Sequence, residues 1–173
     1  LRNFLWYSYE LVMSQLKMPV FDIIQLSETG AVKQALAAEK LLDIDPETLQ
    51  GADTAINGQF AIVRQQMGIA LAPQVIEWIE ELIDGGEEKL VLAGWHHKVL
   101  DLYCAGLEKY GIIRIDGNTS AKMKERLVTQ FGGDPARGIP ADPRIRIAIG
   151  NMQSMGTGTD GLQHVCNHVL VGE

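Results

Sequence analysis

From Lys89 onward the sequence alternates short apolar runs with amphipathic segments of helix length, and this alternation limits the fold more than any other feature. The segments 97–110 and 120–131 place apolar residues at helical spacing. Strands that alternate with helices of this length are joined by crossovers into a parallel sheet. We therefore expect an α/β fold with helices on the faces of a parallel sheet. The expected strands lie near residues 89–94, 112–116, 144–149 and 168–171.

The first half of the chain is expected to be mostly helical. Thr29 or Ser27 can cap a helix through KQALAAEKLL, and a second helix is expected over roughly 55–68. Pro73 suits the first turn of a third helix, which the glycine pair at 85–86 ends.

We divide the chain into a helical lead-in, residues 1–70, and an α/β domain, residues 71–173. Within the lead-in, segment 18–26 fits either a strand or an extended connector. Within the domain, the Gly- and Pro-rich segment 132–143 is expected to form a surface loop.

Charge is unevenly distributed along the chain, whose net charge is -7. Residues 1–88 hold 5 Lys or Arg and 14 Asp or Glu, a balance of -9, whereas residues 89–173 hold 10 and 8, a balance of +2. A polyanionic partner should therefore meet the second half. The sequence has no apolar run of about 18 residues and no signal-peptide pattern, so we expect a soluble, intracellular (cytoplasmic) protein without a membrane partner. Cys104 and Cys166 lie in apolar contexts that favour buried thiols.

The expected strand 144–150 is followed by Gly156, Gly158 and Gly161, which match the G-x-G-x-x-G pattern of dinucleotide-binding proteins. That fingerprint also requires a helix and an acidic residue about 20 positions further on, and the sequence stops at Glu173. A flexible turn is the simplest other interpretation. The glycine pattern alone is weak support for a nucleotide site.

Three motifs in order resemble the C-terminal RecA-like lobe of the SWI/SNF-type translocases, a branch of the superfamily-two helicases. LVLAGWHHKVLDL resembles motif IV with its Trp-His pair, RIDGNTSAKMKERLVTQF resembles the I-D-G-x-T-S segment with its basic helix, and IAIGNMQSMGTGTDGLQ resembles motif V. Upstream, LKMPVFDIIQLSET resembles the stretch that crosses over from the first lobe. The resemblance covers roughly residues 17–173.

The resemblance implies one lobe of an ATP-dependent DNA helicase or translocase. In such an enzyme ATP and Mg2+ bind between two lobes, and the other lobe supplies the Walker A loop and the magnesium ligands. Gly156, Gly158 and Asp160 would line this lobe's side of the nucleotide-binding cleft. The sequence has no G-x-x-x-x-G-K-[ST] pattern and stops before an arginine-rich motif VI. We therefore expect this chain alone neither to hold ATP tightly nor to hydrolyse it.

The expected partners are double-stranded DNA, bound without sequence preference, and the N-terminal helicase lobe. In parallel α/β sheets ligands lie at the carboxyl ends of the strands, so the turns after the strands should share one edge. Hydroxyl groups at a helix start and backbone N–H groups at glycine turns can bind phosphate. The residues that we expect to contact DNA are Trp95, His96, Gly117, Thr119, Ser120, Lys122, Asn151 and Gln153.

Several residues admit a plainer interpretation. Lys124 and Arg126 fit a solvated helix face. His164, Cys166 and His168 share the spacing of metal ligands on a strand, but a helical Gly161–Val165 would separate them, and we expect no metal site.

Two departures from motif V stand out. Met155 replaces a small residue, which challenges the close packing of that turn, and TDGLQHVC is about two residues longer than the usual form. We interpret the longer form as the mark of a separate subfamily, of phage or prophage type. The alternative functions are a non-catalytic module that binds nucleic acid or a partner and, with less support, a Rossmann-type dinucleotide-binding domain.

Overall fold

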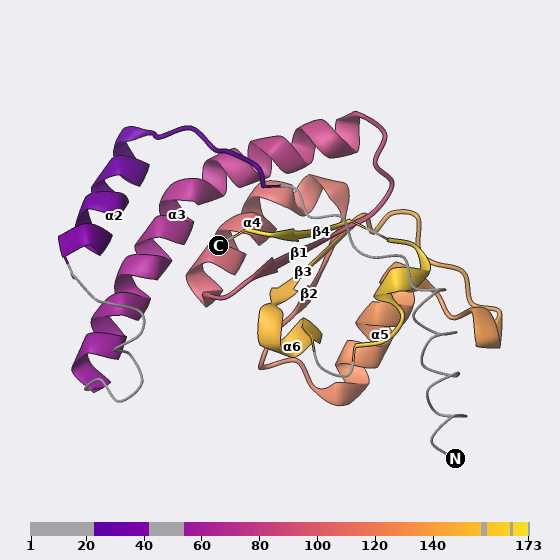
Figure 1. Ribbon diagram of the computed structural model, residues 1–173. Helices are drawn as coiled ribbons and strands as arrows, with labels where there is room; N and C mark the ends of the chain where they lie inside the picture. The colour runs from indigo at the N-terminus through magenta and orange to yellow at the C-terminus, as the bar shows by residue number, and fades with distance from the viewer. Residues whose placement is uncertain (1–22, 42–53, 157–158, 167, 173) are drawn as a thin grey trace, which may run out of the picture.

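The computed structural model describes residues 23–41, 54–156, 159–166 and 168–172. Its centre is a four-stranded, fully parallel sheet with the order β2-β3-β1-β4. The strands are β1 (Leu90–Gly94), β2 (Ile112–Ile115), β3 (Ile147–Asn151) and β4 (Val169–Val171) (Figure 1). The structure confirms the expected α/β fold class, a parallel sheet with flanking helices after a helical N-terminal part.

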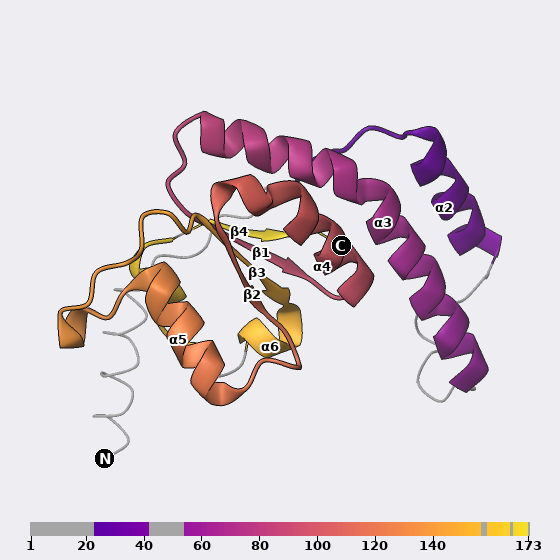
Figure 2. The same ribbon diagram turned by 180° about the vertical axis from the view of Figure 1, so that it is seen from behind.

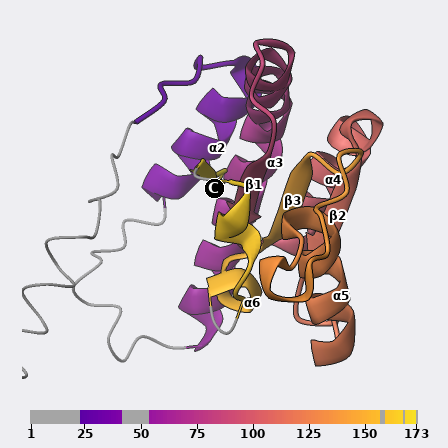
Figure 3. The same ribbon diagram turned by 90° about the vertical axis from the view of Figure 1, so that its right-hand side faces the viewer.

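Helices cover both faces of the sheet, which explains why the central strands are apolar throughout. Leu90 and Leu92 of β1 pack with α4 (His97–Leu107) and the second half of α3 (Thr54–Asp84). Val91, which points to the opposite face, belongs to a second cluster with α5 (Ala121–Gly132). Figure 3 shows α3 on one side of the strands and α5 on the other.

Shorter elements complete the described chain. The helix α6 (Met152–Gly156) directly follows β3, and single 3-10 turns occur at Glu108–Tyr110, Pro135–Arg137 and Leu162–His164. The last of these lies in the segment that we expected to be helical. The expected surface loop at 132–143 is confirmed at residues 135–140, which are all exposed, whereas Gly132 belongs to α5 and is buried, as is Gly133.

Helix α3 corrects the prediction of two separate helices, because it runs unbroken through Pro73 over 31 residues. Pro73 is exposed, whereas Ala72, Val75 and Ile79 are buried in the core on either side of it. Proline inside a helix costs about 3 kcal/mol through its missing N–H and its steric clash. Because the buried stripe continues across Pro73, burial of these side chains offsets that cost.

The first half of α3 extends beyond the sheet and carries α2 (Gly30–Leu41) alongside it (Figure 2). Thr29 caps α2, since its Oγ1 accepts from the N–H of Val32 at 3.3 Å. The preceding chain is attached to α3 by Gln74, whose side chain makes two hydrogen bonds with the backbone of Ser27.

Residues 23–26, at the end of the segment left open between strand and connector, form neither helix nor strand, and residues 18–22 lie outside the described part. The domain boundary placed between residues 70 and 71 falls inside α3 and stays a prediction. None of the helices within the described ranges is long and apolar enough to cross a membrane.

The sequence predicted Lys89 to be part of a strand, but the residue lies just before β1. Its side chain connects the start of β1 to the end of α5 and to the loop that follows it. The residue is only 8% exposed, and its Nζ donates to the carbonyl oxygens of Phe131 at 2.9 Å, Asp142 at 2.8 Å and Ile145 at 2.6 Å. Burial lowers the pKa of Lys89, although the nearby Asp142 carboxylate acts in the opposite direction. The strand expected at 144–149 begins at Ile147 and not at residue 144.

We predict that Lys89→Met destabilises the fold by about 1–3 kcal/mol or more, because methionine fills the space but leaves buried carbonyl oxygens without their donor. The matched change Lys98→Met, at an exposed position of α4, should shift stability by no more than about 0.5 kcal/mol. Urea unfolding of both variants measures the difference. Equal stability of the two variants would show that Lys89 does not hold this loop.

Candidate nucleic-acid interface

The turns that follow β1, β2 and β3 lie together at one edge of the sheet. Because the strands are parallel and in register, Gly94 pairs with Asn151 and Ile115 pairs with Gly150. We call residues 95–97, 116–120 and 151–156, which follow or end these strands, the carboxyl edge (Figure 1). The sheet thus brings together all eight positions expected to contact DNA, with Lys122 in the first turn of the adjoining helix α5.

Asn151 links two of these turns through its side-chain amide. Its Nδ2 donates to the carbonyl oxygen of Trp95 at 2.7 Å, and its Oδ1 accepts from the N–H of Gln153 at 3.0 Å. One side chain therefore fixes the end of β1 and caps the start of α6. The predicted contact residue Asn151 thus has a structural role whatever it binds.

Asp116 organises the turn after β2. Its carboxylate accepts from Arg114 Nε at 2.9 Å and from the N–H of Asn118 at 2.9 Å, while the Asp116 N–H donates to Thr119 Oγ1 at 3.0 Å. Burial raises the pKa of this carboxyl, but the hydrogen bonds from Asn118 and Arg114 outweigh burial and hold the pKa below its usual value. The ionised carboxylate of Asp116 therefore holds the turn together, and Gly117 is exposed at the tip of that turn.

The start of α5 presents hydroxyl groups and a lysine. Ser120 is the N-cap, and its Oγ accepts from the N–H of Met123 at 3.3 Å. The hydroxyls of Thr119 and Ser120 are both acceptors in these turns, so each retains an O–H that can donate to a phosphate. Lys122 is exposed, whereas Lys124 donates its Nζ to the carbonyl oxygen of Ser154 and so ties α5 to α6.

Arg114 extends this turn into a charged network that sequence patterns did not reveal. It donates to Asp101 on α4 as well as to Asp116, and its NH2 atom lies 3.4 Å from Nδ1 of His97. His97 Nδ1 lies 3.7 Å from the Asp116 carboxylate. The single arginine within the β-branched run IIRI was the available signal, and it could not identify these partners.

Met155 fits the turn because Gly150, near the end of β3, has no side chain. A Cβ atom built on Gly150 would lie 2.3 Å from the sulfur of Met155 and 2.3 Å from the carbonyl oxygen of Ile115. Met155 is partly buried against the cluster beneath α5. The departure from the usual small residue is therefore accommodated by the packing.

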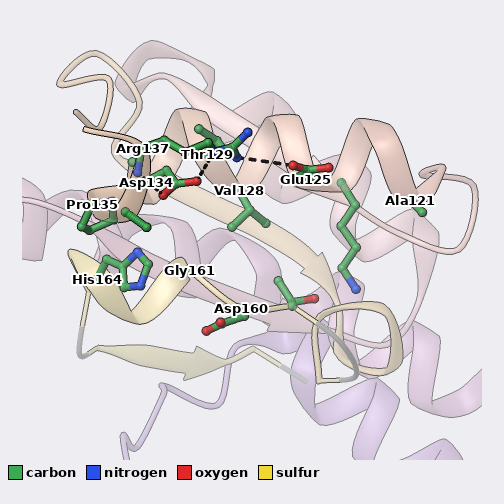
Figure 4. A pocket seen from close by; sticks show the side chains of 14 residues that line it. Ala121, Glu125, Val128, Thr129, Asp134, Pro135, Arg137, Asp160, Gly161 and His164 are labelled. Atoms are coloured by element: carbon green, nitrogen blue, oxygen red, sulfur yellow. Dashed lines mark hydrogen bonds and ion pairs between the residues drawn. The ribbon is translucent and has the colours of Figure 1, made fainter. Parts of the chain in front are cut away.

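Residues 159–164 lie next to α5 and border a hollow of about 600 Å³ (Figure 4). Gly161 packs against the end of α5, and it has φ +119, a conformation that side chains disfavour. The carboxylate of Asp160 accepts a hydrogen bond from Gln163 Nε2. The hollow is lined by Ala121, Lys124, Glu125, Val128, Thr129, Gly133, Asp134, Pro135, Ala136, Arg137, Thr159, Asp160, Gly161 and His164.

The structure describes two of the three residues that we expect at the ATP cleft. Gly156 ends α6, Asp160 lines the hollow, and Gly158 lies outside the described residues. Sequence reasoning did not find the hollow, whose walls come from three separate segments.

His164, Cys166 and His168, the three residues with metal-ligand spacing, have different surroundings in the structure. His164 lines the hollow, His168 Nδ1 lies 2.8 Å from Glu87 Oε2, and Cys166 is buried with its Sγ 3.1 Å from the His168 carbonyl oxygen. Within the described ranges, no three His, Cys, Asp or Glu side chains are grouped so that they could hold a metal ion.

Comparison with curated proteins supports the motif assignment. No family model matches the chain. It is 29% identical over 124 residues to the SWI/SNF-related matrix-associated actin-dependent regulator of chromatin subfamily A-like protein 1 of Xenopus tropicalis, a match that covers 69% of this chain and 13% of the relative. The protein of the same name from Bos taurus is 38% identical over 64 residues, which cover 36% of this chain and 7% of the relative.

Solved structures give two further likenesses. The C-terminal part of the Fun30 ATPase domain has a TM-score of 0.49 and 15% identity, and the match covers 82% of this chain and 52% of that one. The Pyrococcus furiosus Hef helicase domain has a TM-score of 0.41 and 16% identity, over 82% of this chain and 28% of that one.

The resemblance to SWI/SNF-type proteins that the three motifs indicated is therefore confirmed by sequence relatives. The chain spans about an eighth of the length of the Xenopus relative. What such a longer protein does, and the phage or prophage subfamily, are not decided by these matches and stay predictions.

Two glycines of the G-x-G-x-x-G pattern should respond differently to substitution. Gly161→Ala should destabilise the fold by about 1–3 kcal/mol, because alanine is strained at φ +119 and its Cβ would lie 2.8 Å from Val128 Cγ1. Gly156→Ala should change stability by less than about 0.5 kcal/mol, because open space surrounds that position. Thermal or urea unfolding compares the two variants. A larger loss for Gly156→Ala would contradict the described packing.

Proposed function

We propose that this chain is the C-terminal RecA-like lobe of an ATP-dependent DNA translocase of the SWI/SNF type. In this proposal the carboxyl edge contacts the phosphate backbone of DNA, and the segment around Asp160 faces the nucleotide-binding cleft. The N-terminal helicase lobe and DNA are the partners, inside the cell.

The observation that carries the proposal is the meeting of three motifs at the ends of three adjacent strands. The motifs were recognised at separate places in the sequence, yet the register of β2, β3 and β1 puts their polar turns side by side. Any parallel sheet brings such turns to one edge, and in this chain those turns carry the residues of all three motifs. Parallel α/β sheets bind ligands at this edge.

The chemistry of the edge suits phosphate groups better than bases. Thr119 and Ser120 offer hydroxyl donors, Lys122 offers a cation, and the exposed turn at Gly117 leaves room for a backbone to approach. Contacts of this kind position a nucleic acid without reading its sequence. With few net positive charges on this half of the chain, affinity should be modest and its salt dependence shallow.

ATP and Mg2+ belong to the complete enzyme in this proposal. The Asp160 carboxylate would accept hydrogen bonds from a nucleotide or bind its metal ion, but the sequence has no Walker A lysine to neutralise the phosphates. Phosphoryl transfer depends on such positioning and electrostatic groups. This chain alone would therefore form one wall of the cleft, without tight ATP binding or hydrolysis.

The alternative functions fare differently. A non-catalytic module that binds nucleic acid through the same edge remains the main alternative, and only a longer protein with a Walker A loop would separate it from a translocase. The dinucleotide-binding alternative loses support, because the turn after Gly161 is the three-residue 3-10 helix Leu162–His164. The fingerprint requires its glycines to open a full helix.

We predict that the chain binds two unrelated DNA duplexes with similar affinity, and that Lys122→Ala or Gln153→Ala weakens both equally. For Lys122→Ala the slope of log K against log[salt] should become shallower by about 1. The matched control is Lys33→Ala, at an exposed position of α2 on the acidic half, which should leave binding unchanged. Fluorescence anisotropy across a salt series provides the measurement. Strong preference for one duplex, or a greater loss for Lys33→Ala, would place the DNA on another surface.

A further inference from the structure

Trp95 is a large aromatic side chain held at the surface of the carboxyl edge. It is 49% exposed, although tryptophan is usually well buried. Trp78, by contrast, packs against the core of the same molecule. The exposure of Trp95 therefore reflects its position at the end of β1 and not a shortage of core.

The backbone on both sides of the indole is fixed. The carbonyl oxygen of Trp95 accepts from Asn151 Nδ2 at 2.7 Å, and the next residue, His96, is the N-cap of α4. The carbonyl oxygen of His96 accepts from the N–H groups of Val99 and Leu100 at 3.0 and 3.1 Å. A side chain with so few torsions on so constrained a backbone is largely pre-organised for a contact.

The surroundings of Trp95 combine apolar surface with groups that suit phosphate. Met152, which follows the neighbouring strand, is 37% exposed, and Lys98 is exposed in the first turn of α4. The Thr119 turn lies two strands away, about 10 Å by the usual strand spacing. A short stretch of an extended single strand can span that separation.

We propose that Trp95 stacks on an unpaired base of a nucleic-acid strand whose phosphates follow the carboxyl edge. The inference rests on the proposed DNA-binding function and adds to the duplex contacts of the carboxyl edge a contact with a base wherever the strands are unpaired. In an intact duplex the faces of the bases are already stacked on one another. An aromatic platform beside hydroxyl, amide and lysine donors is the arrangement by which proteins hold single strands without reading their sequence.

The test changes both the side chain at position 95 and the presence of unpaired bases in the ligand. The full chain and its variants are titrated with a labelled single strand, with a strand of the same length made entirely of abasic sites, and with the matching duplex. Trp95→Ala should weaken binding of the normal strand by at least about fivefold. The same change should weaken binding of the abasic strand and of the duplex clearly less, because neither offers a free base face.

Two variants separate stacking from simple apolar contact. Trp95→Phe should retain part of the preference for bases, whereas Trp95→Leu, which is apolar without an aromatic face, should behave like Trp95→Ala. Ile62→Ala, at an exposed apolar position on α3, is the matched control and should change nothing. The fluorescence of a 2-aminopurine base in the strand should be quenched by the wild type and not by Trp95→Leu.

The outcomes distinguish this inference from the function on which it rests. If the abasic strand and the duplex bind but Trp95→Ala weakens all three ligands alike, or none, stacking is wrong while DNA binding stands. If Trp95→Leu binds like the wild type, Trp95 is an apolar contact for another surface and the inference also fails. If no nucleic acid binds, the proposed function itself fails.

Discussion

The parallel pairing of β3 between β1 and β2 is the constraint on which the rest of the molecule depends. This register sets Gly94 beside Asn151 and Ile115 beside Gly150, and so aligns the turns that follow three strands. The pairing is stable because helices bury both faces of the central strands, through one cluster under α3 and α4 and another under α5. Without it the three motifs would be scattered turns with no common surface.

Several polar side chains at the carboxyl edge make hydrogen bonds within the protein that stabilise its turns. Asn151 and Asp116 each fix a turn with their own polar atoms, and Ser120 caps α5. Lys122 and Trp95 are exposed at the same edge. These internal hydrogen bonds let the edge hold its shape before a ligand arrives, and the net negative charge lies in the first half of the chain.

The sequence predicted what depends on local periodicity. All four strands and the meeting of their ends followed from alternation and motif order, because a buried parallel sheet requires apolar runs at set intervals. Features that depend on distant partners were not predictable. The unbroken helix through Pro73 reflects burial on both sides of the proline, the role of Lys89 depends on carbonyl groups more than 40 residues away, and Met155 fits only because Gly150 lies beneath it.

The central claim is that the carboxyl edge is the surface that faces nucleic acid. Amide hydrogen exchange of the full chain, with and without saturating DNA, tests this most directly because it reports the position of contact without a substitution. The account predicts slowed exchange at residues 95–98, 116–122 and 151–156, and unchanged exchange in α2 and in the first half of α3. Slowed exchange confined to residues before 88, or to the 132–143 loop, would contradict it.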